Sequence, residues 1–303
     1  MNRRLASRGL LGAALAAALS ACQTAPPSPP VASAPPPPPA PPKPLRPPRI
    51  GLALGGGAAR GFAHIGVIQV LEEAGIKPDL VVGTSAGSLV AALYATGRPG
   101  AELARVALAM DESAITDWSF PGRGLIRGEA LARYVREQTG GKTIEQLAMP
   151  LGIVATDLDS GLPMLFQRGD VGMAVRASSA VPAVFQPVKI GSREYVDGGL
   201  VSPVPVRFAR QMGAELVIAV DITSPPDGNA TGDPFKMLLQ TFAIMGKSIN
   251  QFELKDADIV VRPLLAGVSS ADFTARKRAI DAGRVAGLAA LAGLRARIAA
   301  LMQ

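Results

Sequence analysis

Residues Gly83-Thr84-Ser85-Ala86-Gly87 place one serine between two glycines, in a spacing that suits nucleophilic chemistry. An apolar run at 80–82 precedes them, and residues 88–93 follow with the apolar spacing of a helix. A G-x-S-x-G stretch between a strand and a helix is typical of a nucleophile elbow, a strained turn that lifts the serine out of the strand end. We expect only glycine to fit at 83 and 87, because these positions crowd each other. The N–H groups at the start of the helix would favour negative charge developing at Ser85.

A serine hydroxyl needs a base, and the sequence offers few candidates. His64 is the only histidine and follows the glycine-rich stretch 55–61, so we expect it to brace that loop. That leaves a carboxylate. Asp197 is preferred because two glycines follow it, whereas Asp157 and Asp221 are expected to cap loops or brace the sheet edge. An aspartate near its ordinary pKa of about 3.9 accepts protons poorly, so its site must desolvate it or bond the serine proton tightly.

Composition and charge argue against several other classes of function. The formal net charge is +7, but from position 50 onward 25 basic residues face 24 acidic ones, so the folded part lacks a basic nucleic-acid footprint. One cysteine and one histidine leave no disulfide within the chain and no Cys- or His-based metal site, and we expect no metal and no cofactor. A dinucleotide fingerprint starting at Gly55 would need glycine at 60, where Arg60 stands, so nucleotide binding is not expected either.

The first 49 residues indicate export and attachment to a membrane. Residues 1–21 combine three arginines with a short apolar run, as a signal peptide does, and their end gives the sequence Leu19-Ser20-Ala21-Cys22 with the residue that follows. This ending resembles a bacterial lipobox, in which Cys22 becomes the lipidated first residue; the alternative is an ordinary secretory signal. Residues 22–49 are a proline-rich tether that could extend roughly 80 Å. We therefore expect an exported lipoprotein facing the periplasm, and Gln23 in place of aspartate leaves the outer membrane open as its location.

From residue 50 to 303 the chain is expected to form one α/β domain. The order of strand 50–54, glycine loop 55–61, helix 62–74, strand 80–82, elbow and helix predicts a mostly parallel sheet. Further helices are expected at 102–110, 129–138, 171–178, 206–212, 235–254 and 272–302, and further strands at 151–156, 163–167, 188–190, 194–196, 216–221 and 259–261. Segment 119–128 suits either a flap over a site or a plain surface loop.

Five motifs, taken in order, resemble the patatin-like phospholipase family over about residues 50–265. They are GGGAARGFAHIGVI (55–68), GTSAG (83–87), ATDL (155–158), RASSAVPAVFQP (176–187) and DGG (197–199). The resemblance implies a three-layer fold with helices on both faces of the central sheet, and a dyad of Ser85 and Asp197. It also implies an oxyanion hole from the backbone N–H groups of Gly56 and Gly57. The supporting motif residues would be Gly55, Arg60, Gly61, Gly83, Gly87, Gly198 and Gly199.

These observations together predict a serine acyl-ester hydrolase that works through an acyl-enzyme intermediate. Its expected substrates are phospholipids, lysophospholipids or other fatty-acyl esters. Two alternatives remain at this point: a lipid-binding or scaffold lipoprotein without catalysis on the same fold, and a serine peptidase.

Overall fold

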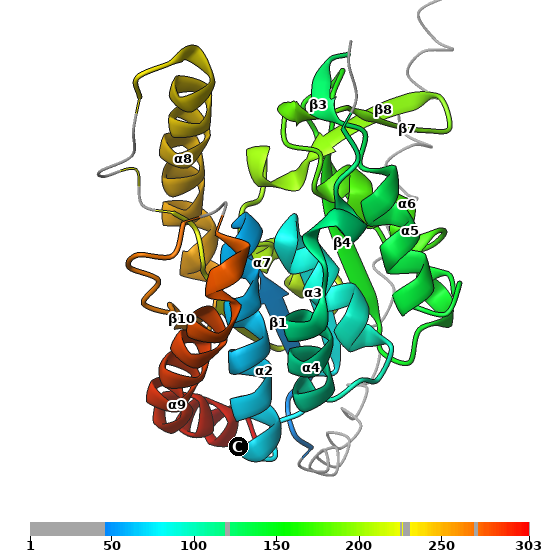
Figure 1. Cartoon of the computed structure of the whole chain (residues 1–303). Coiled ribbons are helices and arrows are strands. Elements are labelled where there is room, and N and C mark those ends of the chain that lie inside the picture. Colours follow the sequence, from blue (N-terminus) through cyan, green and yellow to red (C-terminus); the bar gives the residue numbers. More distant parts are fainter. Residues whose placement is uncertain (1–45, 119–121, 225, 227–230, 270–271, 303) are drawn as a thin grey trace, which may run out of the picture. The chain divides into compact units, whose positions relative to one another are not determined.

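The computed structural model of the chain describes residues 46–118, 122–224, 226, 231–269 and 272–302 (Figure 1). The strands are β1 Ile50–Leu54, β2 Leu80–Thr84, β3 Gly124–Ile126, β4 Leu151–Asp157, β5 Pro163–Phe166, β6 Ala183–Phe185, β7 Val188–Ile190, β8 Arg193–Asp197, β9 Leu216–Val220 and β10 Ile259–Val261. The α-helices are α2 Phe62–Glu73, α3 Ala86–Ala95, α4 Gly100–Ala109, α5 Glu129–Gln138, α6 Val171–Ser178, α7 Val206–Gln211, α8 Pro234–Glu253 and α9 Arg276–Leu301. The expected signal peptide and all but the last few residues of the tether lie outside the described residues.

The central sheet has the strand order β10-β9-β1-β2-β4-β8-β7, and β5 also pairs with β4. The pairs from β10 to β4 are parallel, while β5, β7 and β8 pair antiparallel. All five residues of β1 are buried, as expected for a strand of a parallel sheet that is covered on both faces. The predicted α/β class with a mostly parallel sheet is confirmed.

The alternation of side chains along the strands divides the core into two layers. Leu52 and Leu54 of β1 join the core cluster formed with α2, α3 and α9, whereas Ala53 between them joins the cluster formed with α7. The expected three layers are therefore present, with helices on both sides of the sheet (Figure 1).

Close packing of α2 against α9 fixes the helix that follows the glycine loop. A Cβ atom on Gly66 would lie 2.0 Å from the carbonyl oxygen of Ile280, and one on Gly283 would lie 2.0 Å from that of Ala63. Both glycines thus allow the two backbones to touch. The C-terminal helix begins at Arg276, later than the expected 272, because Asp272 first caps a short 3-10 turn at Phe273–Ala275.

Segment 119–128 contains a strand. Residues 119–121 lie outside the described part, but Gly124–Ile126 form β3, which pairs in parallel with β6. The Asp117 carboxylate accepts hydrogen bonds from the N–H groups of Gly128, Glu129 and Ala130 at the start of α5. Pairing and capping hold residues 124–130 against their neighbours.

Across the described ranges, the helices are all too short or too polar to cross a bilayer.

Candidate active site

Ser85 occupies a strained turn between β2 and α3. Its backbone angles are φ 52° and ψ −125°, and it is one of three described residues other than glycine with positive φ. A Cβ atom on Gly83 would lie 2.4 Å from the carbonyl oxygen of Gly87, and one on Gly87 would lie 2.2 Å from that of Leu54. Both contacts are far shorter than packing tolerates, so side chains are excluded on either side of the serine. The turn therefore has the geometry of a nucleophile elbow.

Buried hydroxyl groups hold the peptide groups around Ser85. Its N–H donates to Ser178 Oγ at 2.8 Å, and Ser178 Oγ donates in turn to the carbonyl of Val154. On the strand side, Thr84 Oγ1 donates to the carbonyl of Ser202 at 2.8 Å. Ser178 lies within the RASSAVPAVFQP motif, but neither its contact nor that of Ser202 could be read from the sequence, because the partners come from distant segments.

Asp197 lies at the end of β8 as a buried carboxylate that is only 6% exposed. Burial raises its pKa from 3.8 to about 6, and this outweighs the lowering by the Ser85 hydroxyl and by the Gly199 N–H, which donates to Oδ1 at 2.7 Å. Oδ2 has no hydrogen-bond partner among the described residues, although the Ser85 hydroxyl lies near enough to lower the pKa of the carboxyl. Hydrogen bonds between catalytic groups commonly tighten when substrate binds.

Of the two glycine-loop N–H groups expected to form the oxyanion hole, one is free and one is engaged. Gly56 N–H donates to the carbonyl of Pro203 at 2.9 Å, so this predicted oxyanion donor is already engaged. The N–H of Gly57 makes no hydrogen bond to any described residue. Ala58, the next residue, has a φ of 49°, and strain of this kind is a feature of functional loops. The sequence could not show the Gly56 bond, because Pro203 reaches the loop only through the tertiary fold.

His64 is fully buried and contacts the glycine loop. Its Nε2 lies 2.8 Å from the carbonyl oxygen of Gly55, an acceptor, so Nε2 carries the hydrogen. Burial lowers the pKa of His64 to about 4, which keeps the imidazole neutral at pH 7. The ring therefore braces the loop at Gly55, in line with the expectation from sequence, and its Nε2–H is committed away from any base role.

Arg60 closes the other end of the same loop. Its backbone N–H donates to the carbonyl of Gly57 at 3.1 Å, and its Nη1 donates to Ser224 Oγ at 2.7 Å. Burial lowers the pKa of the guanidinium, and nearby Asp221 opposes that effect. Asp221 otherwise accepts from Thr223 and pairs with Arg262, so it braces the loop after β9.

Asp157 also has a structural environment. Its carboxylate accepts from the N–H groups of Asp159 and Ser160 and pairs with Arg193. The Ser160 hydrogen bond and then the Arg193 contact lower its pKa to about 2. These bonds occupy the carboxylate in a turn. Asp157 thus caps a loop, and the choice of Asp197 as the base stays a prediction.

A cleft of about 850 Å³ opens over the serine and the aspartate. Six of the residues named from the sequence line it: Gly56, Gly57, Arg60, Ser85, Asp197 and Gly199. The other five do not line the cleft, and a Cβ atom on each would lie within 3 Å of a neighbouring atom: Gly55, Gly61, Gly83, Gly87 and Gly198. The opposite side consists of α8 and residues 263–269. The described part of segment 119–128 does not line the cleft, so the flap interpretation is not supported there.

One loop connects three parts of this cleft. The carbonyl of Ser202 accepts from Thr84 beside the nucleophile, and the carbonyl of Pro203 accepts from Gly56. The hydroxyl of Ser202 donates to the carboxylate of Glu253, at the end of α8, at 2.6 Å. Burial raises the pKa of Glu253 to about 7, although Ser202 and Arg207 lower it. The elbow, the glycine loop and α8 are thus joined through two consecutive residues, a link that no sequence motif signalled.

A sequence model described as patatin-like phospholipase matches residues 52–210, a range that contains both Ser85 and Asp197. The chain belongs to the patatin-like phospholipase family. An uncharacterised NTE family protein of Mycobacterium tuberculosis is 40% identical over 186 residues, which make up 60% of this chain and 51% of that protein. Patatin-like phospholipase domain-containing protein 6 of Mus musculus is 34% identical over 232 residues, 73% of this chain and 16% of that protein. The chain spans about half the length of the mycobacterial relatives it matches.

VipD from Legionella pneumophila shares the fold. The two structures superpose with a TM-score of 0.54 and 14% identity, over 80% of this chain and 66% of that one. At this identity the likeness shows the arrangement of the patatin-like fold and not its chemistry.

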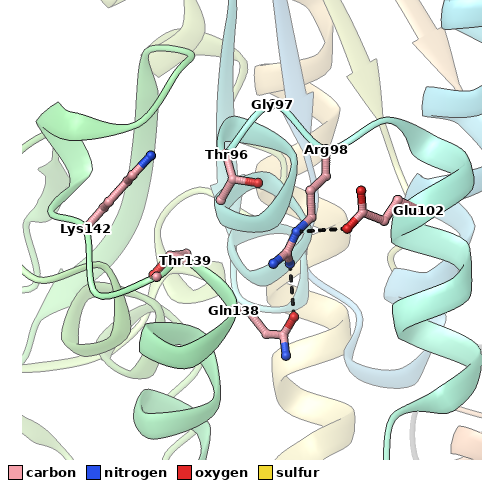
Figure 2. Close-up of a pocket in the computed structure, with 8 residues that line it drawn as sticks. Thr96, Gly97, Arg98, Glu102, Gln138, Thr139 and Lys142 are labelled. Atoms are coloured by element: carbon pink, nitrogen blue, oxygen red, sulfur yellow. Dashed lines mark hydrogen bonds and ion pairs between the residues drawn. The ribbon is translucent and has the colours of Figure 1, made fainter.

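A second cavity, of about 330 Å³, shares no residue with the cleft of this patatin-like domain. Figure 2 shows Arg98 in it, held between Glu102 and Gln138. Arg98 Nη1 donates to Gln138 Oε1 at 3.0 Å, and Arg98 Nε lies 3.4 Å from Glu102 Oε1. Because these polar groups satisfy one another, we assign no chemistry to this cavity. Within the described ranges, no three residues of the His, Cys, Asp and Glu types are grouped as metal ligands.

Proposed function

We propose that the protein is a serine acyl-ester hydrolase that cleaves fatty-acyl esters of lipids through an acyl-Ser85 intermediate. The observation that carries this proposal is Ser85 on a strained elbow, beside a buried Asp197, in one cleft of about 850 Å³. Membership of the patatin-like phospholipase family supports the same reaction class.

Asp197 would act as the base of the first step. With its pKa raised to about 6 by burial, the carboxylate remains mostly ionised at pH 7 and is a better proton acceptor than a free aspartate. Its unpartnered Oδ2 can take the Ser85 proton while Oδ1 stays bonded to Gly199 N–H. Ser85 Oγ then attacks the ester carbonyl, and the carbonyl electron pair moves to oxygen.

The negative oxygen would be stabilised by N–H groups of the glycine loop. The N–H of Gly57 is free to donate, and that of Gly56 could join only by sharing or releasing its bond to Pro203. One such donor in a dry site is worth about a hundredfold or more in rate. Asp197 then gives its proton to the departing alcohol oxygen. In the second step Asp197 takes a proton from a water molecule, whose oxygen attacks the acyl carbonyl. The bond to Ser85 Oγ then breaks, Ser85 regains its proton from Asp197, and the fatty acid is released.

The lining of the cleft favours an apolar acyl chain. Its far wall carries the side chains of Leu239, Phe242, Met245, Leu264, Leu265 and Val268. Apolar walls around a few convergent polar groups are usual for sites that bind largely apolar ligands. This supports a lipid ester in preference to a peptide, the substrate of the peptidase alternative.

Replacement of the nucleophile tests the proposal. Ser85→Ala should abolish both hydrolysis of short- and long-chain nitrophenyl esters and labelling by a fluorophosphonate probe, because it removes only the attacking oxygen. Ser192→Ala, in the exposed turn between β7 and β8, is the matched control and should keep both. An unlabelled wild-type protein would support the alternative of a lipid-binding or scaffold lipoprotein without catalysis. Faster turnover of peptide amides than of esters would support the peptidase.

We also propose that Cys22 carries a lipid anchor that tethers this domain to a membrane after export, facing the periplasm. The support is the sequence Leu19-Ser20-Ala21-Cys22 and the proline-rich stretch that follows it. Metabolic labelling with palmitate should mark the wild type and not Cys22→Ala, and residues 50–303 should stay folded in the variant. A wild-type protein that takes up no label would show that the anchor proposal is wrong.

A further inference from the structure

Helix α8 exposes several large apolar side chains. Among its residues whose burial is described, Gly246, Asn250 and Glu253 are the buried ones, and two of these three are polar. Large apolar side chains are exposed along the helix at Met237, Leu239, Ile244, Met245 and Phe252, and Phe252 is 70% exposed. An amphipathic helix on a globular domain normally has the reverse arrangement, with its apolar stripe in the core.

Helical geometry places four of these five exposed side chains on one face, while Leu239 lies on the other side and lines the cleft. At 3.6 residues per turn, positions 237, 244, 245 and 252 fall within one stripe, and positions 246, 250 and 253 fall on the opposite side. We call Met237, Ile244, Met245 and Phe252 the outer stripe of α8. Figure 1 shows α8 standing at one edge of the domain, apart from the helices that cover the sheet. Of the outer stripe, Met237, Ile244 and Phe252 line no part of the cleft.

The outer stripe is continuous with the cleft. Met245 belongs to the stripe and also lines the cleft. Leu264, which is 85% exposed, lines the cleft from the neighbouring segment 263–269. A ligand entering past α8 would thus meet apolar side chains from the surface inward. Exposed apolar patches of this kind usually mark an interaction site.

The charged residues between the two ends of α8 are lysines, whereas the acidic residues Asp233, Glu253 and Asp256 lie at its ends. No acidic residue occurs from Pro234 to Phe252, while Lys236 and Lys247 lie in this range. Lys236 pairs with Asp233, whereas Lys247 forms no ion pair with a described residue. At the end of the helix, Lys255 Nζ lies 5.1 Å from the centre of the Phe252 ring. Apolar side chains flanked by lysines are the pattern of helices that lie in the interface of anionic membranes.

We propose that the outer stripe of α8, together with Leu264, is a lipid-docking surface that seats the cleft directly on an anionic bilayer or micelle. This inference rests on the proposed lipid-ester hydrolysis. It adds a route by which a lipid ester passes from the membrane surface along α8 to Ser85. The occupant is a lipid surface and not a second copy of the chain, because lysines flank the stripe and because it opens into the cleft that a lipid ester must enter. The surface is separate from the proposed anchor at Cys22, which would keep the protein near a membrane but would not orient it.

The experiment uses the full chain with Cys22→Ala as the parent, so that no anchor contributes. Two matched variants each add a pair of substitutions to this parent. One replaces Ile244 and Phe252 by serine; neither residue lines the cleft. The control replaces Val285 and Leu288 of α9, which are comparably exposed, by serine. Binding is measured by flotation with vesicles of phosphatidylcholine, with and without phosphatidylglycerol. Hydrolysis is measured on a monomeric short-chain nitrophenyl ester and on the vesicle lipids.

The α8 variant should bind anionic vesicles about tenfold or more weakly than the parent and hydrolyse vesicle lipids correspondingly more slowly. Both variants should hydrolyse the monomeric ester at the parent rate, which also shows that they are folded. Vesicle binding by the α8 variant equal to that of the parent would overturn the docking surface. The docking surface would also be overturned if light scattering showed that the parent is a dimer and the α8 variant a monomer. The outer stripe would then be a contact between two copies of the chain. A parent that hydrolyses no ester but binds vesicles through α8 would refute the proposed function and leave the docking surface standing.

Discussion

Replacement of Asp197 by asparagine should make the protein more stable while it removes activity. Burial raises the pKa of this carboxyl from 3.8 to about 6, a change of about two pKa units, and each unit corresponds to about 1.4 kcal/mol. The ionised carboxylate therefore destabilises the fold by about 3 kcal/mol at neutral pH. Asparagine keeps the shape and the oxygen that accepts from Gly199 N–H, but it carries no charge. Asp197→Asn should gain up to about 3 kcal/mol in free energy of unfolding.

The gain must depend on pH with a definite sign. Below pH 3.8 the aspartate is protonated in both the folded and the unfolded chain, so wild type and variant should differ little. Between 3.8 and about 6 the unfolded chain loses its proton first, and the wild type loses stability relative to the variant. Above about 6 the difference should stay constant.

Urea unfolding of both proteins across this pH range measures the difference directly, with ester hydrolysis recorded on the same samples. A purely structural aspartate would give the opposite result, namely a variant that is less stable at pH 8. A stability gain that is the same at pH 4 and pH 8 would also refute the argument, because it could not come from ionisation. Activity of the folded variant near that of the wild type would show that Asp197 is not the base.

Three further changes test other parts of the site. The kcat/KM for a monomeric ester should fall about tenfold per pH unit below about pH 6, because Asp197 becomes protonated. Glu253→Gln should leave the pH of this inflection unchanged; a shifted inflection in that variant would assign the titration to Glu253. His64→Asn should lower the melting temperature, because the neutral ring braces the loop at Gly55. Activity should stay within about tenfold of wild type with an unchanged pH profile, and a folded but inactive variant would contradict this. Gly87→Ala should prevent soluble folding, because its Cβ atom would lie 2.2 Å from the carbonyl oxygen of Leu54. The control Gly232→Ala, which has open space around its Cβ atom, should fold normally; a soluble and active Gly87→Ala protein would disprove the close contact.

The sequence by itself determined the local framework of this protein. Runs of apolar residues fixed β1 and β2, and the helical spacing after each glycine turn fixed α2 and α3. Glycines on both sides of Ser85 predicted the elbow, because close backbone contact leaves no alternative residue type. The physics of these features acts over a few neighbouring residues, and the order of types along the chain is enough to reveal it.

Only the tertiary structure decided how the site is supported and tuned. The Ser85 N–H meets the Ser178 hydroxyl across 93 positions in the sequence, and Thr84 meets Ser202 across 118. The pKa of Asp197 depends on how deeply the whole fold buries it, and the engagement of Gly56 depends on where Pro203 arrives. The helical pattern of α8 predicted its length but not that its polar positions would face inward. Burial and hydrogen bonding between distant segments are properties of packing, and a linear pattern does not state which segments will meet.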